Sequence, residues 1–468
     1  MTKYLLIICY IKKGVLNMKK IILSIISIFI IITILIVDNS KVINKADNNK
    51  IKVNNNLLSM MLETEANSGK YEMTTSSSWP TDGYVFNSSL SKCENGGKLS
   101  WDNENKKVIF DGNNIDKCYV YFDVYVPLRY ISEVCSVGGN LSSCITNLAN
   151  QSSPSFTSIY HHDGTLENGI NDDSYRYAGA SDAVNNFVCF GSNAEECPTD
   201  NLYRIIGVID DRVKLIKYDY ATSDLLGTDG DYYDAYRSVE YIDGSSYYKG
   251  STYANIAVYN WNYNADTSNN SNTWSTSLLN KTNLNTNFIN NIGNTWSSKI
   301  ATTTWKVGGN TLANIVNVVP SETYQNEIIN PDSTGSTDNA TEYSAKVGLV
   351  YVSDYEFAAS PSAWTLVGYN QQYPTKSYKA ATTSNWMYMG LNEWTISRES
   401  STSDQLAIRI VPDGMTVNGF TRVYYGVRPV FSLLPSITYA GGTGSMSSPI
   451  RINWLSISTV KHHICFKI

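Results

Sequence analysis

The longest uninterrupted hydrophobic run of the chain lies near its N-terminus, at Ile21–Val37. Its length is at the short limit for spanning a hydrocarbon core of roughly 30 Å. Two lysines precede it directly, and lysines on this flank keep the N-terminal side in the cytoplasm. No small-x-small cleavage site follows. We therefore expect an uncleaved signal anchor over 18–37, with a removed signal peptide as the alternative, and residues 1–17 as a cytoplasmic extension.

After this run the pattern changes twice. Residues 38–70 are rich in Asn, Lys and Ser and are expected to form a linker, with a short helix at Leu57–Glu63. The pattern of residues 71–154 predicts a small β-rich module. Its elements are a hairpin within Lys98–Phe110, around a polar turn, and a strand of aromatic and β-branched residues at Cys118–Val126.

The remaining region, 155–453, mixes strand and helix patterns. The strongest hairpin is Tyr203–Lys217, where two β-branched runs flank the turn Asp210–Asp211. Apolar residues at helical spacing predict two short helices between 273 and 300. Further strands are predicted at Val347–Val352, Gln405–Val411 and Gly426–Leu434. Together the patterns predict an α+β domain with long loops, followed by an unstructured tail at 454–468.

Cysteine usage agrees with export. Six cysteines lie in the body of the chain, and six allow 15 pairings among which sequence cannot choose. An even count outside the cytoplasm favours structural disulfides over metal or redox chemistry, and no Cys-x-x-Cys motif occurs. The simplest arrangement joins neighbours along the chain: Cys93 with Cys118, Cys135 with Cys144, and Cys189 with Cys197.

The charge of the body excludes one class of function. The whole chain has 36 basic and 42 acidic residues, and seven of the lysines lie in 1–20 and 454–468, which contain no acids. The body therefore keeps 29 basic and 42 acidic residues, a net charge of −13. Such a surface repels phosphate backbones, so we expect no nucleic-acid partner.

Four short motifs follow one another towards the C-terminus: Asn385–Tyr388, Glu393–Ser397, Gly426–Val430 and Pro449–Ile452. In this order they resemble the DUF6273 family of exported bacterial proteins over residues 155–453. A Gly-Val/Phe-Arg strand is also similar, more distantly, to the formylglycine-generating-enzyme domain, which implies a C-type-lectin-like fold suited to binding. The active cysteines of those enzymes are absent, because no cysteine lies between Cys197 and Cys465.

Aromatic residues are the most informative surplus, with 34 Tyr in the chain. Many of them crowd a stretch rich in Gly and Ser, and Tyr, Ser, Gly and Asn together form adaptable binding surfaces. Aromatic faces also stack on sugar rings. The alternative is that Trp261 and its neighbours belong to the core. The expected binding surface comprises Tyr232, Tyr233, Tyr236, Tyr247, Tyr248, Tyr259, Trp261 and Tyr263.

Two polar clusters are candidates for metal or acid–base chemistry. The carboxylates of Asp229, Asp231 and Asp234 suit a structural calcium, although an acidic surface turn is the favoured interpretation. The run His161–Asp163 could ligate a metal or act as a base. Adjacent residues of a strand point to opposite faces, so a solvated loop is favoured there. No other cofactor is expected.

These observations predict a bacterial cell-surface protein, held by a single membrane pass, with the bulk of the chain extracellular. We expect a disulfide-stapled β module and a C-type-lectin-like domain that binds a glycan or a host or surface protein without catalysis. No Gly-x-Ser-x-Gly elbow or Walker-type loop is present. A cell-wall glycan hydrolase using unrecognised carboxylates, and a structural surface component, stay open as alternatives.

Overall fold

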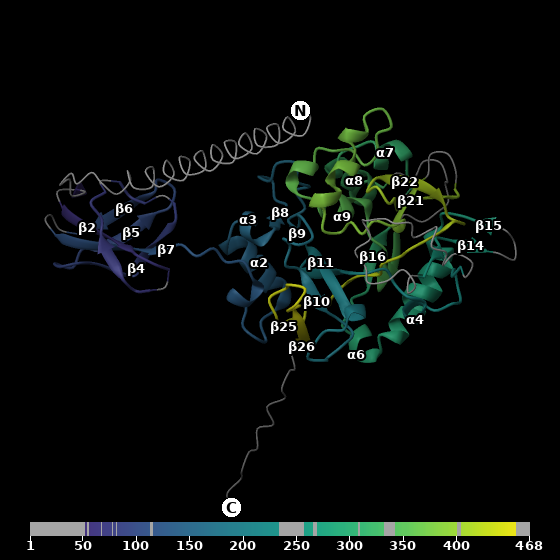
Figure 1. Ribbon diagram of the computed structural model, residues 1–468, viewed down its shortest axis with the longest axis horizontal. Coiled ribbons are helices and arrows are strands. Elements are labelled where there is room, and N and C mark those ends of the chain that lie inside the picture. Colours follow the sequence, from purple (N-terminus) through teal and green to yellow (C-terminus); the bar gives the residue numbers. More distant parts are fainter. Residues whose placement is uncertain are drawn as a thin grey trace, which may run out of the picture. The chain divides into compact units, whose positions relative to one another are not determined.

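The computed structural model describes residues 52–53, 56–66, 68–76, 78–80, 82–112, 116–233, 257–264, 269–307, 309–331, 342–399 and 404–454. It is a mixed α+β structure, dominated by β-sheets and closed by disulfides (Figure 1). The expected extension at 1–17, signal anchor at 18–37 and all but the first residue of the tail lie outside the described residues. Among those described, no helix is long and apolar enough to cross a membrane.

The chain divides into two compact units, which we call the small unit (up to Val126) and the large unit (from Pro127). The boundary predicted at residue 154 is therefore wrong. Residues 127–154 belong to the large unit because Ile131 and the buried face of α2 (Leu141–Gln151) join its hydrophobic core. Each unit is described by itself.

The small unit contains a five-stranded sheet in the order β1–β2–β7–β4, with β3 alongside β2. The central pair, β2 and β7, is parallel, and β5 and β6 form a separate antiparallel hairpin. That hairpin and β7 confirm the strands expected from the sequence. The bounds are β1 Lys52–Val53, β2 Asn56–Glu63, β3 Tyr71–Met73, β4 Tyr84–Cys93, β5 Lys98–Asp102, β6 Lys107–Asp111 and β7 Lys117–Val124.

The segment Leu57–Glu63 is a strand and not the short helix expected inside a linker. Leu58 and Met60 alternate along β2 and are buried, and Val120 and Phe122 do the same on the adjacent β7. Alternation at period two places all four side chains on one face, where they form the core of the small unit with β6. Long-range pairing with β7 therefore overrides the local helical preference.

The large unit contains a seven-stranded sheet in the order β19–β24–β12–β11–β9–β8, with β10 alongside β11. The hairpin β11–β12 is the one predicted at Tyr203–Lys217. Its strands are buried on both faces, so they read as continuous apolar runs. The strands of this sheet are β8 Ile159–His161, β9 Tyr175–Tyr177, β10 Phe187–Cys189, β11 Leu202–Ile209, β12 Arg212–Lys217, β19 Val347–Gly348 and β24 Val430–Ser432.

A second, four-stranded sheet has the order β17–β20–β21–β22, and two-stranded ribbons complete the β-structure. The strand expected at Gln405–Val411 is β21, and β24 lies inside the one expected at Gly426–Leu434. The bounds are β13 Tyr259–Asn260, β14 Tyr263–Asn264, β15 Asn269–Asn270, β16 Thr303–Lys306, β17 Gly309–Asn310, β18 Glu342–Ala345, β20 Glu393–Glu399, β21 Leu406–Ile410, β22 Thr416–Phe420, β23 Tyr424–Tyr425, β25 Ile437–Gly441 and β26 Arg451–Trp454.

The helices of the large unit are short. The two short helices expected between 273 and 300 correspond to a helical stretch of the structure. In this stretch η6 is a π-helix that continues into α5. The helical bounds are η1 Ile131–Glu133, α2 Leu141–Gln151, α3 Pro154–Thr157, η2 Thr199–Asn201, α4 Ser223–Leu226, η5 Trp274–Thr276, η6 Leu279–Phe288, α5 Ile289–Asn291, α6 Asn294–Ser297, α7 Leu312–Val316, α8 Pro320–Tyr324, η7 Gln325–Ile329, α9 Val352–Phe357, η8 Pro361–Ala363, η9 Pro374–Lys376 and η10 Tyr378–Ser384.

The strand predicted at Val347–Val352 is mostly wrong, because only Val347 and Gly348 pair, and Val352 begins α9. The cause is a tertiary contact. The carboxylate of Glu327 accepts hydrogen bonds from the backbone N–H groups of Val352 and Ser353, both at 3.0 Å. These groups have no partner inside a helix, so their capping stabilises a helix start at this point.

Three of the sequence motifs meet at one buried guanidinium. Arg428, from Gly426–Val430, donates through Nε to Glu393 and through an Nη nitrogen to the carbonyl of Met387, both at 2.8 Å. The three residues are fully buried. A charge buried in this way is stable only when it is paired and hydrogen-bonded, so Arg428 has a structural role that joins the motifs.

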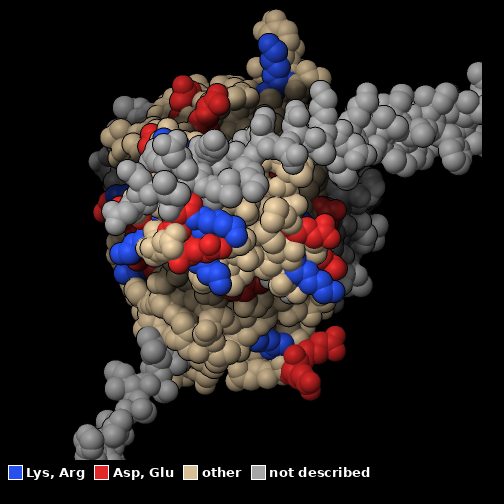
Figure 2. All heavy atoms as spheres, turned by 90° about the vertical axis from the view of Figure 1, so that its left-hand side faces the viewer, with Lys and Arg blue, Asp and Glu red and all other residues tan. Residues whose placement is uncertain are grey.

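The surface contrasts with this interior. On the face drawn in Figure 2, Lys and Arg side chains lie beside Asp and Glu, and uncharged residues cover most of the area. Exposed pairs of this kind contribute little to stability. Charged groups that are buried therefore carry more information about function than those on this face.

Candidate ligand-binding pocket

One cavity of the large unit brings buried charged groups and aromatic rings together. It holds about 200 Å³ and is lined by residues of β12, β16, the β11–β12 turn and the N-terminal end of α9. Ligand pockets for drug-sized molecules usually hold roughly 300–1,000 Å³. This cavity therefore suits a single small group, of the size of one sugar ring or less.

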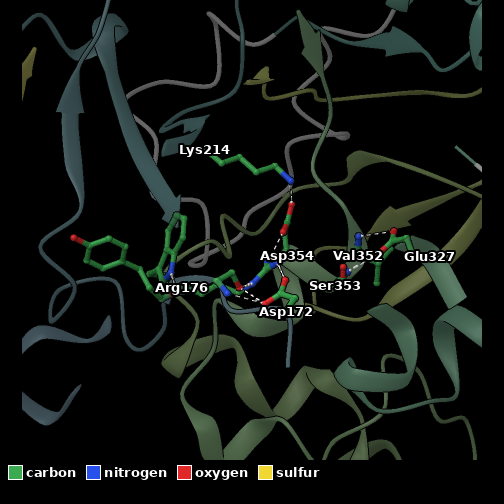
Figure 3. Close-up of polar contacts among 10 residues, drawn as sticks. Asp172, Arg176, Lys214, Glu327, Val352, Ser353 and Asp354 are labelled. Carbon is green, nitrogen blue, oxygen red and sulfur yellow. Dashed lines mark hydrogen bonds and ion pairs between the residues drawn. The ribbon is translucent and has the colours of Figure 1, made fainter. Parts of the chain in front are cut away.

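The floor of the cavity is a network of four charged side chains (Figure 3). Asp354 lies at its centre and accepts from Arg176 Nη1 at 2.8 Å and from Lys214 Nζ at 2.5 Å. Arg176 also donates to Asp172 at 3.1 Å and, through Nε, to the hydroxyl of Ser174 at 2.8 Å. Two cations and two anions thus compensate one another below the cavity.

The secondary structure explains how these residues meet. Arg176 lies on β9 and Lys214 on β12, the two strands that flank β11. At Gly207 of β11, a Cβ atom would lie 2.3 Å from the carbonyl oxygen of Tyr175, so only glycine allows β9 to approach this closely. Asp354 comes from the first turn of α9, where a carboxylate also interacts favourably with the helix dipole.

Both acids of the floor are held ionised. Burial alone raises the pKa of Asp354, but the charges of Lys214 and Arg176 outweigh it and bring the pKa below its ordinary value. For Asp172, burial likewise raises the pKa. The charge of Arg176 and the hydrogen bonds from Ser174 outweigh burial and bring the pKa below its ordinary value. Neither carboxyl group therefore has a proton to donate near neutral pH.

Aromatic rings form the walls. Lys214 Nζ lies 4.6 Å from the ring centroid of Tyr351 and 5.6 Å from that of Trp305, and the two ring centroids are 6.0 Å apart. On the other side, the guanidinium of Arg176 lies 5.7 Å from the ring of Tyr324. Such cation–π contacts stabilise a buried cation and fix its position.

The rim is more exposed and also charged. Arg212 lies two residues before Lys214 on β12, so both side chains are on the same face of the strand. One Nη nitrogen of Arg212 donates to the carbonyl of Thr302 at 3.3 Å. Lys306 is paired with Glu342, and Asp210 lies exposed on the turn between β11 and β12. Exposed Thr304 completes the entrance.

A second buried acid supports the site from behind. Glu327 caps the start of α9 through Val352 and Ser353, next to the residues that line the cavity (Figure 3). Its carboxylate also accepts from the hydroxyl of Ser397. Burial raises the pKa of Glu327 to about 7, against the effect of these hydrogen bonds. Glu327 is thus a positioning residue for the N-terminal turn of α9.

Two side chains of the tyrosine-rich surface predicted from the sequence lie in the core. Tyr259 and Trp261 are buried in the core, and each donates to a backbone carbonyl at 2.9 Å. Their expected role in ligand binding is therefore wrong. Tyr232, Tyr233 and Tyr263 are partly exposed. The remaining three, Tyr236, Tyr247 and Tyr248, lie outside the described residues.

The acidic cluster expected to hold calcium makes contacts within the protein. Asp231 is buried, and its carboxylate accepts from the backbone N–H of Leu279 at 2.8 Å and of Tyr263 at 3.2 Å. Burial raises the pKa of Asp231 to about 6 despite these bonds. Asp229 accepts from the amide of Asn287 at 2.6 Å. Asp231 therefore holds the start of η6, and Asp229 contacts the same helix near its end. Asp234 lies outside the described residues.

The two histidines point to different environments. His161 is partly exposed, stacks on Tyr175 at 4.1 Å between ring centroids, and pairs with Asp173 at 2.6 Å. His162 is fully buried against Phe357, and burial lowers its pKa to about 3, so it is neutral. The two imidazoles therefore do not converge on one metal ion.

All six body cysteines form the pairs expected from their order: Cys93–Cys118, Cys135–Cys144 and Cys189–Cys197. In the small unit, Cys93 and Cys118 are partners in register on β4 and β7. Asp116 lies close to them, but its carboxylate accepts from the backbone N–H groups of Asn95 and Gly97. The sulfurs are covalently paired, so this group is no metal site.

Sequence reasoning missed the residues of the cavity. One signal was present, because Arg212 and Lys214 are cations inside a strand that otherwise predicts complete burial. The partner of Lys214, Asp354, and the second cation on that carboxylate, Arg176, are far away in sequence, and only the fold joins them. Comparison with known proteins adds no further signal: no family model, curated protein or solved structure matches this chain.

Proposed function

We propose that this protein is a membrane-tethered bacterial cell-surface protein whose large unit binds a glycan, without catalysis, in the cavity next to Lys214 and Asp354. The observation that carries this proposal is a cavity with a compensated ionic floor, beside which the rings of Trp305 and Tyr351, 1% and 6% exposed, hold Lys214 in position. Pockets of this composition orient a polar ligand through few, well-placed polar groups.

Binding is favoured over hydrolysis by the state of the carboxyl groups. A glycoside hydrolase needs one acid that carries a proton and one carboxylate within reach of the same bond. Asp172 and Asp354 line the cavity, and both are ionised and committed to Arg176. The acid with a raised pKa, Glu327, is turned towards the backbone of α9. The cavity thus offers recognition rather than acid catalysis.

The family resemblance supports the same class of function. The motifs around Met387, Glu393 and Arg428 are in direct contact, which is expected if they are the shared structural elements of one domain. We therefore propose membership of the DUF6273 family and a C-type-lectin-like fold for residues 155–453. Attachment by the hydrophobic run Ile21–Val37, with an extracellular body, rests on the sequence alone.

A glycan array with the full chain, purified in detergent with its disulfides oxidised, tests the proposal. Thr304→Trp would fill the entrance with an indole ring from an exposed position. Thr199→Trp places the same ring on an exposed site away from the cavity. We expect wild type and Thr199→Trp to bind a defined glycan class with or without a calcium chelator, and Thr304→Trp to lose that binding.

A blank array with folded protein would contradict the proposal and favour a protein partner or a structural surface role. Binding that survives in Thr304→Trp would place the site elsewhere. Release of a shortened sugar from any bound glycan would favour the hydrolase instead.

A further inference from the structure

The hydrogen-bond donors of the cavity are unequally used. Arg176 has Nε and both Nη nitrogens engaged by Ser174, Asp354 and Asp172. Lys214 Nζ carries three donor hydrogens, and among the described residues one acceptor, Asp354, lies within hydrogen-bond distance. Three of the five N–H groups of Arg176 and one of the three of Lys214 are thus engaged, and Lys214 keeps two hydrogens that can donate to a molecule in the cavity.

Arg212 extends this donor set along the same strand face. Its guanidinium has five N–H groups, and the bond to Thr302 uses one of them. Arg212 and Lys214 are two residues apart on β12 and both line the cavity. Two cations at this spacing can hold one ligand group between them, and a guanidinium favours a planar or tetrahedral anion with several oxygens.

The charges around the cavity leave one cation uncompensated. Arg176 and Lys214 are balanced by Asp172 and Asp354, and Lys306 on the rim is balanced by Glu342. Arg212 remains. Asp210 and Asp211 precede it on the turn, and Asp210 also lines the cavity, but neither forms an ion pair with Arg212 among the described residues. Both acids are exposed, so water and salt screen their charges.

We propose that the group bound in this cavity is anionic, a carboxylate or phosphate carried by an acidic glycan, held between Lys214 and Arg212. This inference rests on the proposed function and names its ligand class. The anionic oxygens would accept from the two cations. The rings of Trp305 and Tyr351, which are almost fully buried, would keep Lys214 in position beside the ligand. The body of net charge −13 repels acidic polymers at long range, so binding of an acidic glycan would depend on the two cations of the cavity.

The test compares three probes of similar length: a uronic-acid oligosaccharide, a glycerol-phosphate polymer and a neutral oligosaccharide. The full chain should bind one of the two acidic probes at least about tenfold more tightly than the neutral one, and the preference should shrink as salt rises. Whichever acidic probe binds identifies the anion as a carboxylate or a phosphate.

Variants of the rim connect the preference to the residues. Arg212→Gln should weaken the binding of the acidic probe about tenfold, because one charged hydrogen-bonding group is lost, and should leave the binding of the neutral probe unchanged. Arg212→Lys should recover part of the affinity. Lys281→Gln removes an exposed cation elsewhere in the large unit and should change nothing.

The outcomes separate the two proposals. Equal binding of acidic and neutral probes, blocked by Thr304→Trp, would overturn the anionic ligand while the proposed function stands. An unchanged acidic preference in Arg212→Gln would also overturn it. If Thr304→Trp leaves the binding of every probe unchanged, the cavity is not the binding site and both proposals fail.

Discussion

Asp354 is the residue on which the floor of the cavity depends, because it accepts from two buried cations at once. Such networks often contribute less net stability than their short distances suggest, since both charges lose their hydration. The cost of removing one member is nevertheless high, because the others stay buried without compensation. The network therefore fixes geometry more than it stabilises the fold.

Replacing Asp354 by Ala should accordingly destabilise the large unit by about 3–5 kcal/mol, because Arg176 and Lys214 lose their shared partner. Urea unfolding of the full chain measures this loss. The control is Lys379→Ala, which removes an exposed cation 3.6 Å from Asp413 and should cost less than about 1 kcal/mol. Equal effects of the two variants would show that the buried network carries no special energetic role.

Glu327 gives a pH dependence with a defined sign. Burial raises its pKa from 4.5 to about 7 in the folded chain, so folding takes up a proton between these values. The stability that this group contributes is present below about pH 4.5 and is lost as pH rises towards 7, by about 3 kcal/mol. Glu327→Gln cannot titrate and should lack this part of the decline.

Urea unfolding at pH 4.5 and pH 8 compares wild type, Glu327→Gln and Glu322→Gln, where Glu322 is exposed on the neighbouring α8. The first variant should show a flatter pH profile than wild type, and the second should follow wild type. Parallel profiles for all three chains would mean that Glu327 keeps an ordinary pKa.

At the residue scale, sequence reasoning succeeded where chemistry is local. The cysteine pairs follow their order along the chain. The solvated loop favoured for His161–Asp163 is wrong for His162, which is fully buried. Sequence reasoning also failed for Trp261 and for Asp354, because burial and ion pairing depend on partners far away in sequence. An abundant aromatic residue type marks a core as readily as a surface.

Among the elements, α9 shows how a tertiary contact decides secondary structure. The sequence of Val347–Val352 is apolar and β-branched, and it predicts a strand. Glu327 caps the backbone at Val352 and Ser353, so a helix begins at the last residue of this run. By contrast, the hairpin Tyr203–Lys217 was predictable because its turn and pairing lie within one short segment.

The disulfide between β4 and β7 should matter most to the small unit. The unit is small, and the bond closes a loop of 25 residues, which corresponds to about 3–4 kcal/mol of chain entropy. The double variant Cys93→Ser and Cys118→Ser should lower the melting transition of the small unit and leave that of the large unit in place. Differential scanning calorimetry resolves the two.

The matched control removes the bond between Cys189 and Cys197, which lies in the large unit. That double variant should lower the melting transition of the large unit and leave that of the small unit in place. A single shift shared by both variants would contradict the division of the chain into separately folded units.

For the whole molecule, the hydrophobic run at Ile21–Val37 predicts an integral membrane protein with its body outside. When the full chain is expressed in bacterial cells, we expect it to stay with the membrane after an alkaline carbonate wash. A tag at the C-terminus should be removed by protease added to intact cells. Recovery of the chain in the culture medium would instead indicate a cleaved signal peptide.

Hydrogen–deuterium exchange of the full chain locates the ligand site. A glycan that binds on the array should slow exchange in β16 and at the start of α9, where Thr304, Ser353 and Asp354 line the cavity. Protection at these two segments, absent in Thr304→Trp, is the result we predict. Protection confined to the tyrosine-rich stretch around Tyr232 and Tyr263, with these segments unchanged, would contradict the account.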